Sequence, residues 1–301
     1  MAKGNILVIA LLCGAFALAA VGEQEPSGSA HPQRTEEERR ALINRTVDNQ
    51  QRDDALLDIY ERIERVEKRK RAGDSDPIEI NVYRAVPAGT GTDRIPLGPD
   101  AKPTDEAAYR RELEKLAHSL EWAAQSGRAQ RDAYQKVAKK RRERNELIDA
   151  ARTAFVYTWV ADEPRGDRLL SKFRMEPNPG YRPTSRATSI LTKVSGYLWI
   201  DEAEGELARV DCVTTDDISI GGFLAKVYKG SHFMQERYAI APGVWLPSFS
   251  QYDFDGRKFF SSMAVHERTF YSHYRRIGPP KEALALIRAE LSKAAGADAD
   301  P

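Results

Sequence analysis

Cysteine is almost absent from this chain of 301 residues, which contains only Cys13 and Cys212. Because Cys13 lies in a predicted N-terminal export signal, the mature chain keeps one thiol and cannot form a disulfide within a monomer. Cys212 lies on a predicted strand with Val210 and Val213, where a small buried hydrophobe is expected. Stability must therefore come from a hydrophobic core.

The chain also lacks an excess of charge of either sign. Its 46 Lys and Arg residues are balanced by 45 Asp and Glu residues, which gives a formal net charge of +1. Cleavage of the predicted signal before Ala20 or Glu23 removes Lys3 and leaves the balance neutral. Because no global field draws such a protein to nucleic acid or acidic lipid, we expect no nucleic-acid partner.

Motifs of common catalytic and metal centres are missing as well. The chain contains no Gly-x-Ser-x-Gly elbow, and its histidines form no zinc-type pair such as His-Glu-x-x-His. The acidic pair Asp216-Asp217 is typical of a solvated turn, and Lys229-Gly230-Ser231 lacks the spacing of a phosphate-binding loop. We therefore predict a non-enzymatic protein with no cofactor and no metal site. The enzymatic alternative is a hydrolase whose catalytic residues do not match these motifs.

No apolar run is long enough to span a bilayer comfortably. The segment from Ile6 to Val21 follows the basic Lys3 and ends in small residues, as secretory signal peptides do. We predict a signal peptide at 1–22 and an exported mature chain. The alternatives are an uncleaved membrane anchor and acylation of Cys13, although Leu12 is not the small residue that lipoprotein processing normally needs.

The first third of the mature chain mixes polar and apolar segments. Residues 23–40 are polar, contain Pro26 and Gly28, and predict a flexible leader. Residues 41–54 predict a short helix, and the stretches 56–68 and 78–83 favour strands. Residues 88–102 are rich in Gly and Pro, and predict a loop.

A long charged block at 104–153 predicts helix. Thr104 can cap its start, and Gly127 is expected to break it. The stretch Arg128 to Arg144 is nearly all polar and predicts a solvated basic middle, followed by a short helix that leads into a sheet. After the pair Pro279-Pro280, residues 281–301 predict a C-terminal helix and tail.

The region from Phe155 to Ile277 indicates an antiparallel sheet built from successive hairpins. Aromatic and β-branched runs near 196–201, 207–213, 233–240, 245–254 and 259–270 alternate with short turns. Asp255-Gly256 is a strong hairpin signal, and the connections are too short for parallel crossovers. Together with the helical block, this pattern predicts an α+β protein.

The predicted sheet carries many large apolar side chains. A packed core and a sheet that wraps an apolar ligand have the same composition, so both interpretations remain open. The short stripe of Leu113, Leu116 and Leu120 on the helical block is expected to pack on the sheet as a lid, and is too small to cover it. The residues predicted to line an apolar ligand site are Phe173, Met175, Trp199, Met234, Tyr238, Ile240 and Trp245.

A basic run in the helical block has two interpretations. Lys139, Lys140, Arg141 and Arg142 can contact anionic lipid headgroups at a membrane surface. They can equally form a solvated helix face, because Glu143 and other acids lie nearby.

Part of the chain resembles the LolA-like superfamily of bacterial periplasmic proteins. The resemblance covers roughly Leu56 to Ile277 and is carried by the runs from Gly196 to Asp201, Leu207 to Val210, Gly221 to Gly230 and Gly243 to Pro247. It implies a strongly curved antiparallel β half-barrel over 41–280, with helices over its open face and acyl chains held between sheet and lid. The long charged block departs from the family, and no functional residue of lipoprotein carriers can be carried over.

The sequence therefore predicts a periplasmic binding protein that holds a lipid or lipidated protein in an apolar cleft between sheet and helices, with transient membrane contact. Such a protein would serve transport to the outer membrane. The rival hypothesis is a scaffold or envelope-stress sensor with a dry sheet core, whose partner is another envelope protein.

Overall fold

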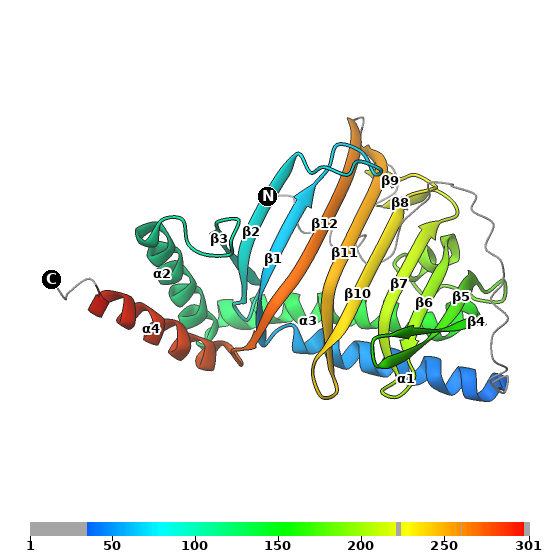
Figure 1. Cartoon of the computed structure of the whole chain (residues 1–301), viewed down its shortest axis with the longest axis horizontal. Coiled ribbons are helices and arrows are strands. Elements are labelled where there is room, and N and C mark those ends of the chain that lie inside the picture. The colour runs from blue at the N-terminus through cyan, green and yellow to red at the C-terminus, as the bar shows by residue number, and fades with distance from the viewer. Residues whose placement is uncertain (1–34, 221–223, 260, 298–301) are drawn as a thin grey trace. The chain divides into compact units, whose positions relative to one another are not determined.

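The structure is a computed structural model that describes residues 35–220, 224–259 and 261–297 (Figure 1). The predicted export signal and Cys13 lie outside the described residues. The chain divides into two compact units, where the sequence predicted one domain over 41–280. The first contains the described residues up to Arg52, with Lys68–Ile78 and Arg144–Arg268; the second contains Asp53–Glu67, Glu79–Glu143 and the described residues from Thr269.

Antiparallel hairpins dominate the first unit, as predicted. Strands β4 (Phe155–Arg165), β5 (Arg168–Pro177), β6 (Val194–Asp201) and β7 (Glu206–Thr214) pair in chain order, after a short 3-10 helix, η2 (Thr188–Lys193), that precedes β6. Strand β10 (His232–Ala241) lies beside β7 and pairs with β11 (Val244–Lys258), which is followed by β12 (Ser261–Arg276) (Figure 1). The protein is therefore α+β with antiparallel strands.

The Asp255-Gly256 hairpin prediction is wrong. Both residues lie inside β11, where Gly256 faces Val227 of the short strand β9 (Ala225–Val227), itself paired with β8 (Ile218–Ile220). A Cβ on Gly256 would lie 2.1 Å from the carbonyl oxygen of Lys226. Glycine is therefore needed here for the close approach of a neighbouring strand rather than for a turn.

Helix α1 (Glu36–Leu56) begins five residues earlier than predicted, so the flexible-leader prediction is wrong from Glu36 onward. The start is a capping box, in which the Thr35 hydroxyl accepts from the Glu38 backbone N–H. The Glu38 carboxylate in turn accepts from the Thr35 N–H. This pattern of Thr and Glu three residues apart is visible in the sequence.

The second unit contains β1 (Tyr60–Lys68), β2 (Glu79–Pro87), β3 (Thr92–Leu97), α2 (Glu106–Ala123) and α4 (Pro280–Ala297). The loop prediction for 88–102 is wrong, because β3 pairs antiparallel with β2 within it. Gly89 supplies the positive φ of the tight connection. Pro96 is tolerated because β3 is an edge strand, where a missing N–H costs no ladder bond on the open side.

The helical block is two helices, separated at Gly127 as predicted. Asp105, not Thr104, caps α2, since its carboxylate accepts from the Ala108 N–H. The second helix, α3 (Arg128–Ala154), runs unbroken through the predicted solvated middle. Its residues are mostly Ala, Arg, Lys, Gln and Glu, which favour helix intrinsically and need no apolar stripe. The C-terminal helix prediction is confirmed by α4.

Helices α2 and α4 pack against each other in the second unit (Figure 1). Leu113, Leu116 and Leu120 are each at most 2 % exposed and share a core with Ile95 of β3 and Ile287 of α4. Beside this core, Arg84 of β2 is buried and bonds Glu61, Tyr109 and Glu290. The three leucines predicted to form a lid are therefore buried in the core of this unit.

Candidate functional site

An apolar cleft lies in the first unit between the β-strands and two helical segments. Its volume is about 140 Å³. One wall is α1 and the end of α3, and the other is formed by strands β4 to β7 and β10. The residues that line it are Ile43, Thr46, Val47, Gln50, Leu147, Ile148, Ala151, Phe155, Tyr157, Met175, Leu191, Leu198, Leu207, Val210, Cys212, Phe233 and Gln235.

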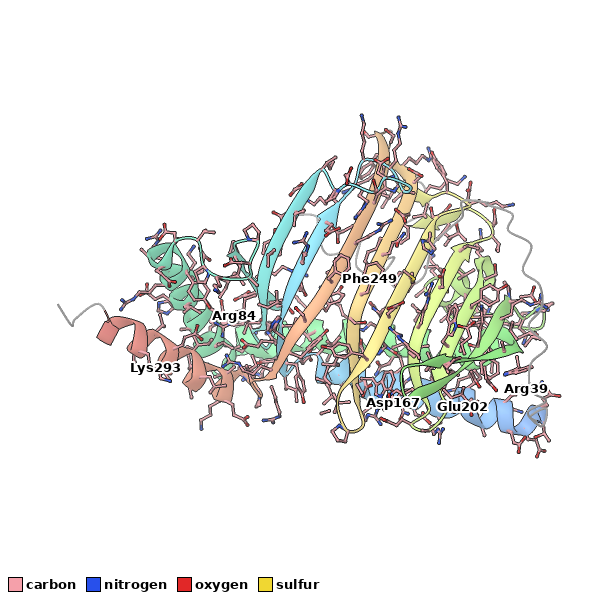
Figure 2. All side chains as sticks on the ribbon, in the orientation of Figure 1. Arg39, Arg84, Asp167, Glu202, Phe249 and Lys293 are labelled. Atoms are coloured by element: carbon pink, nitrogen blue, oxygen red, sulfur yellow. The ribbon has the colours of Figure 1, made fainter. Side chains whose placement is uncertain are left out.

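Helical spacing places the apolar residues of α1 toward the cleft. Ile43 and Val47 are four residues apart and therefore lie on one face of the helix. The polar face is held at the β6–β7 turn, which carries Glu202 (Figure 2). Arg45 donates to the carbonyl of Glu202, and Asn49 donates to that of Gly205. Gly205 has a φ of 69°, in the left-handed region that favours glycine, so glycine suits this turn.

The end of α3 is fixed to α1 on the outer side of the cleft. Arg152 donates to the carbonyl of Asn44 at 2.9 Å and pairs with Asp48 at 2.6 Å. Gln51 donates to the carbonyl of Asn145. The inner side of α3 presents Ala151, whose small side chain leaves space against the strands. Polar clamps thus hold the helices while the volume between them and the strands stays unfilled.

The polar groups along the cleft are neutral. The Tyr157 hydroxyl donates to the carbonyl of Ala151 at 2.8 Å, and the Thr46 hydroxyl donates to that of Leu42. Burial raises the pKa of the Tyr157 phenol and of the Cys212 thiol well above their usual values. The cleft therefore holds no thiolate at neutral pH, and its surface suits an apolar group.

One end of the cleft is polar. Arg237 of β10, only 2 % exposed, donates from Nη1 to Gln50 Oε1 at 2.8 Å and also to the carbonyl of Trp245. Gln235, two residues earlier on β10, lies 3.3 Å from the hydroxyl of Ser250. A carboxamide from α1 and one from β10 thus lie at this end, backed by a buried guanidinium.

The size of the cleft restricts its occupant. A cavity of roughly 150 Å³ lined by aliphatic and aromatic side chains can take up benzene, whereas pockets for drug-sized ligands measure roughly 300–1,000 Å³. In this conformation the cleft accommodates a short apolar group. A longer chain requires α1 or the end of α3 to move outward.

The seven residues predicted to line a ligand site do not share one face. Phe173 and Met175 belong to the core cluster that contains Leu198, whereas Trp199 and Trp245 form a separate cluster with Leu170 and Ala208. The pairing places Leu198 opposite Phe173, so its neighbour Trp199 points to the other face of the sheet. Met175 alone of the seven lines the cleft.

Charged side chains cover the face that carries the two tryptophans. The Trp199 indole donates to Glu163 at 2.6 Å, and Arg209 and Lys172 lie 4.8 and 5.1 Å from its ring centroid. The Trp245 indole donates to Glu204, and Arg168 lies 4.9 Å from its ring. Among the other predicted residues, Met234 and Ile240 are half-buried and Tyr238 is 37 % exposed.

The lid and membrane-contact residues lie in the second unit. Leu113, Leu116 and Leu120 share no cluster with the cleft residues. In the basic run, Lys139, Lys140 and Arg142 are exposed, and Lys139 lies 3.9 Å from Glu143. Arg141 is half-buried and forms an ion pair with Asp58. The membrane role of this run stays a prediction.

A second cavity of about 570 Å³ in the first unit is lined in part by His232, Asp211 and Asp253. The Nε2 of His232 lies 3.0 Å from Asp211 and its Nδ1 lies 3.6 Å from Asp253. Burial by itself lowers the pKa of His232, but the two carboxylates outweigh it and raise this pKa to about 9. The imidazole is therefore a fixed cation at neutral pH and cannot act as a general base there.

The cleft residues missed at the sequence level come mainly from the two helices. Val47 and Leu147 follow helical spacing, but nothing in the sequence pairs α1 with the end of α3. In the sequence, nothing distinguishes Gln50 and Gln235 from other polar residues. Only the structure shows that they line the cleft. In the described ranges, no group of three or more His, Cys, Asp or Glu side chains is placed to hold a metal ion.

Comparisons with known proteins are sparse. No protein-family model matches the chain, and no curated protein matches it. The chain is similar to the crystal structure of a DUF1329 family protein from Desulfovibrio piger, with 10 % sequence identity, 78 % of this chain and 93 % of that chain covered, and a TM-score of 0.24. A match at this level assigns neither fold nor function. No helix within the described part of the chain is long and apolar enough to cross a membrane.

Proposed function

We propose that the first unit is a non-enzymatic binding module that holds the acyl chain of a lipid or lipidated protein in the apolar cleft. One observation carries the proposal: α1 and α3 are clamped over the strands by polar contacts, while aliphatic and aromatic side chains beneath them border unfilled space. Each methylene buried there gains about 0.8 kcal/mol, so a short chain segment already contributes useful affinity.

The proposal includes the finer fold assignment that the sequence suggested. The strands would form a half-barrel of the LolA-like kind, with α1 and the end of α3, rather than α2, as its cover. Transfer of a lipidated cargo toward the outer membrane is the corresponding biological role. A carrier must also release its cargo, and a cover held by surface hydrogen bonds and ion pairs can open more readily than a continuous core.

Export to the periplasm is part of the same proposal. It rests on the apolar segment from Ile6 to Val21 and the small residues that follow. N-terminal sequencing of protein recovered from the producing cell tests it, with a mature start expected near Ala20 or Glu23. Recovery of intact Met1, or of an acylated Cys13, contradicts it.

Filling the cleft tests the binding function directly. Ala151→Leu adds methylenes that occupy the space an acyl chain would use, and should weaken binding of a fluorescent fatty acid about tenfold or more while the protein stays folded. Ala138→Leu on the same helix is the matched control, because Ala138 is exposed. Equal binding by both variants and by the wild type contradicts the proposal, as does absence of binding by delipidated, folded wild-type protein.

A protein-binding scaffold or sensor is the second candidate function. It is favoured by β4, the outer strand of the β4–β7 sheet, on which Val156, Trp159 and Val160 are exposed. An exposed apolar edge strand suits pairing with a strand of another protein. Trp159→Lys should abolish capture of such a partner from cell-envelope extract without changing fatty-acid binding; loss of fatty-acid binding instead would remove this candidate.

A further inference from the structure

Gln50 is one of the few polar side chains that line the cleft. It lies on α1, one turn after Thr46 and Val47, and lines the polar end of an otherwise largely apolar surface. Ligand sites of this kind usually contain a few polar groups that fix the orientation of the ligand. The hydrogen-bonding state of these groups therefore indicates which head group the cleft accepts.

The orientation of the Gln50 amide follows from its partner. A guanidinium only donates hydrogen bonds, so the Gln50 atom that faces Arg237 Nη1 at 2.8 Å must be the carbonyl oxygen. The Gln50 Nε2 amide then points away from Arg237. Within the described residues it donates to no protein acceptor, so two N–H donors remain for a ligand or water.

The other polar groups of the cleft use part or all of their protons within the protein. The hydroxyls of Tyr157 and Thr46 donate to backbone carbonyls. Gln235 donates one of its two N–H groups to Ser250. Gln50 keeps both N–H groups, and Arg237, bonded to its oxygen, polarises the amide and strengthens a bond to a ligand.

We propose, as an extension that rests on the binding function above, that Gln50 determines head-group specificity by donating from Nε2 to the carbonyl or carboxylate oxygen of an acyl group. The hydrocarbon chain then runs from this end along Val47 and Phe233. Cationic head groups are disfavoured, because the guanidinium of Arg237 lies directly behind the amide.

Ligands of equal chain length and different head groups test this without any mutation. We choose octanoate, octanamide and octyltrimethylammonium, which share a chain length and differ in head group, and isothermal titration calorimetry on the full mature chain near neutral pH. Octanamide and octanoate should bind about tenfold or more tightly than octyltrimethylammonium. The octanamide and octanoate arms separate recognition of a neutral carbonyl from recognition of a charged carboxylate.

A variant pair assigns the preference to Gln50. Gln50→Met keeps the length of the side chain but removes the donor, and should reduce octanamide affinity about 2- to 10-fold and octanoate affinity about 10- to 100-fold. Its binding of octyltrimethylammonium should not fall. Gln135→Met is the matched control, since Gln135 is exposed on α3 and does not line the cleft.

The outcomes separate this inference from the function on which it rests. Equal affinity of the wild type for all three head groups overturns the specificity role and leaves acyl binding intact. So does an unchanged preference in folded Gln50→Met. Failure of the wild type to bind any of the three, or any longer fatty acid, contradicts the binding function itself.

Discussion

In the second unit the apolar face of α2 is buried in a core, whereas in the first unit an apolar cleft remains beneath the helices. In the second, Leu113, Leu116 and Leu120 of α2 meet aliphatic side chains from β2, β3 and α4. In the first, Ile43, Val47, Leu147 and Ala151 of α1 and α3 border an apolar cleft. Apolar composition alone therefore does not separate a core from a site.

The two units also differ in their buried charges. In the second, the buried Arg84 pairs with the half-buried Glu290. Although burial opposes the charge of both groups, their hydrogen bond contributes to a raised pKa of Arg84 and a lowered pKa of Glu290. In the first, His232 lies between two carboxylates. The Arg84–Glu290 pair keeps its charges over the accessible pH range, whereas His232 can lose its proton as the pH rises.

We expect the two units to differ most in the unfolding free energy that is lost when one leucine in each unit is truncated to alanine. Leu116→Ala in the closed core should cost about 2–5 kcal/mol of unfolding free energy, because it leaves a new cavity. Leu207→Ala at the cleft should cost roughly 1–2 kcal/mol, since that side chain is half-buried and already borders unfilled space. Denaturant unfolding of both variants measures this, and equal costs would contradict the proposed difference in packing.

The second largest difference is expected in how the stability of the two units depends on pH. The pKa of His232 rises from 6.5 to about 9 on folding. Its stabilising contribution is thus fully present below pH 6.5 and is lost as the pH rises toward 9 and beyond. Hydrogen exchange should show weaker protection of β7, β10 and β11 at pH 9 than at pH 7, after correction for the intrinsic rate, and no such change around Arg84.

The variant His232→Gln is the control for that measurement. It removes the titrating imidazole and should make protection of these strands nearly independent of pH between 6.5 and 9. An unaltered pH dependence in this variant would assign the effect to another group.

The smallest expected effect concerns the basic run of α3. Replacing Lys139, Lys140 and Arg142 with Gln should leave the second unit folded, because these side chains are exposed. If the run contacts membranes, co-sedimentation with anionic vesicles should decrease and become less sensitive to salt. Arg141 is left unchanged because of its ion pair with Asp58. If the wild-type protein does not bind anionic vesicles at low salt, only the interpretation as a solvated helix face remains.

Local signals explain what the sequence predicted correctly. The hairpins around Gly205 and Gly243 and the helix break at Gly127 depend on a few neighbouring residues. Strand β3 was missed because Gly and Pro are frequent in and around it, and Gly256 was misjudged because the neighbour that requires it is Lys226.

The candidate site was only partly predictable. An apolar cleft between strands and helices was expected, but α2 was chosen as its cover in place of α1 and the end of α3. Trp199 was placed on the face of Phe173, because the register that pairs Phe173 with Leu198 cannot be read from the alternation within one strand. The role inferred for Gln50 depends on Arg237, which is far away in the sequence.

Methyl NMR of the mature protein tests the central claim most directly, because it reports both units in one experiment. With methyl groups of Ile, Leu and Val labelled, addition of octanoate should shift the signals of Ile43, Val47, Leu147 and Val210 in the cleft. The signals of Leu113, Leu116 and Leu120 should stay in place. Shifts confined to the second unit, or no shift in either unit with any fatty acid, would contradict the account.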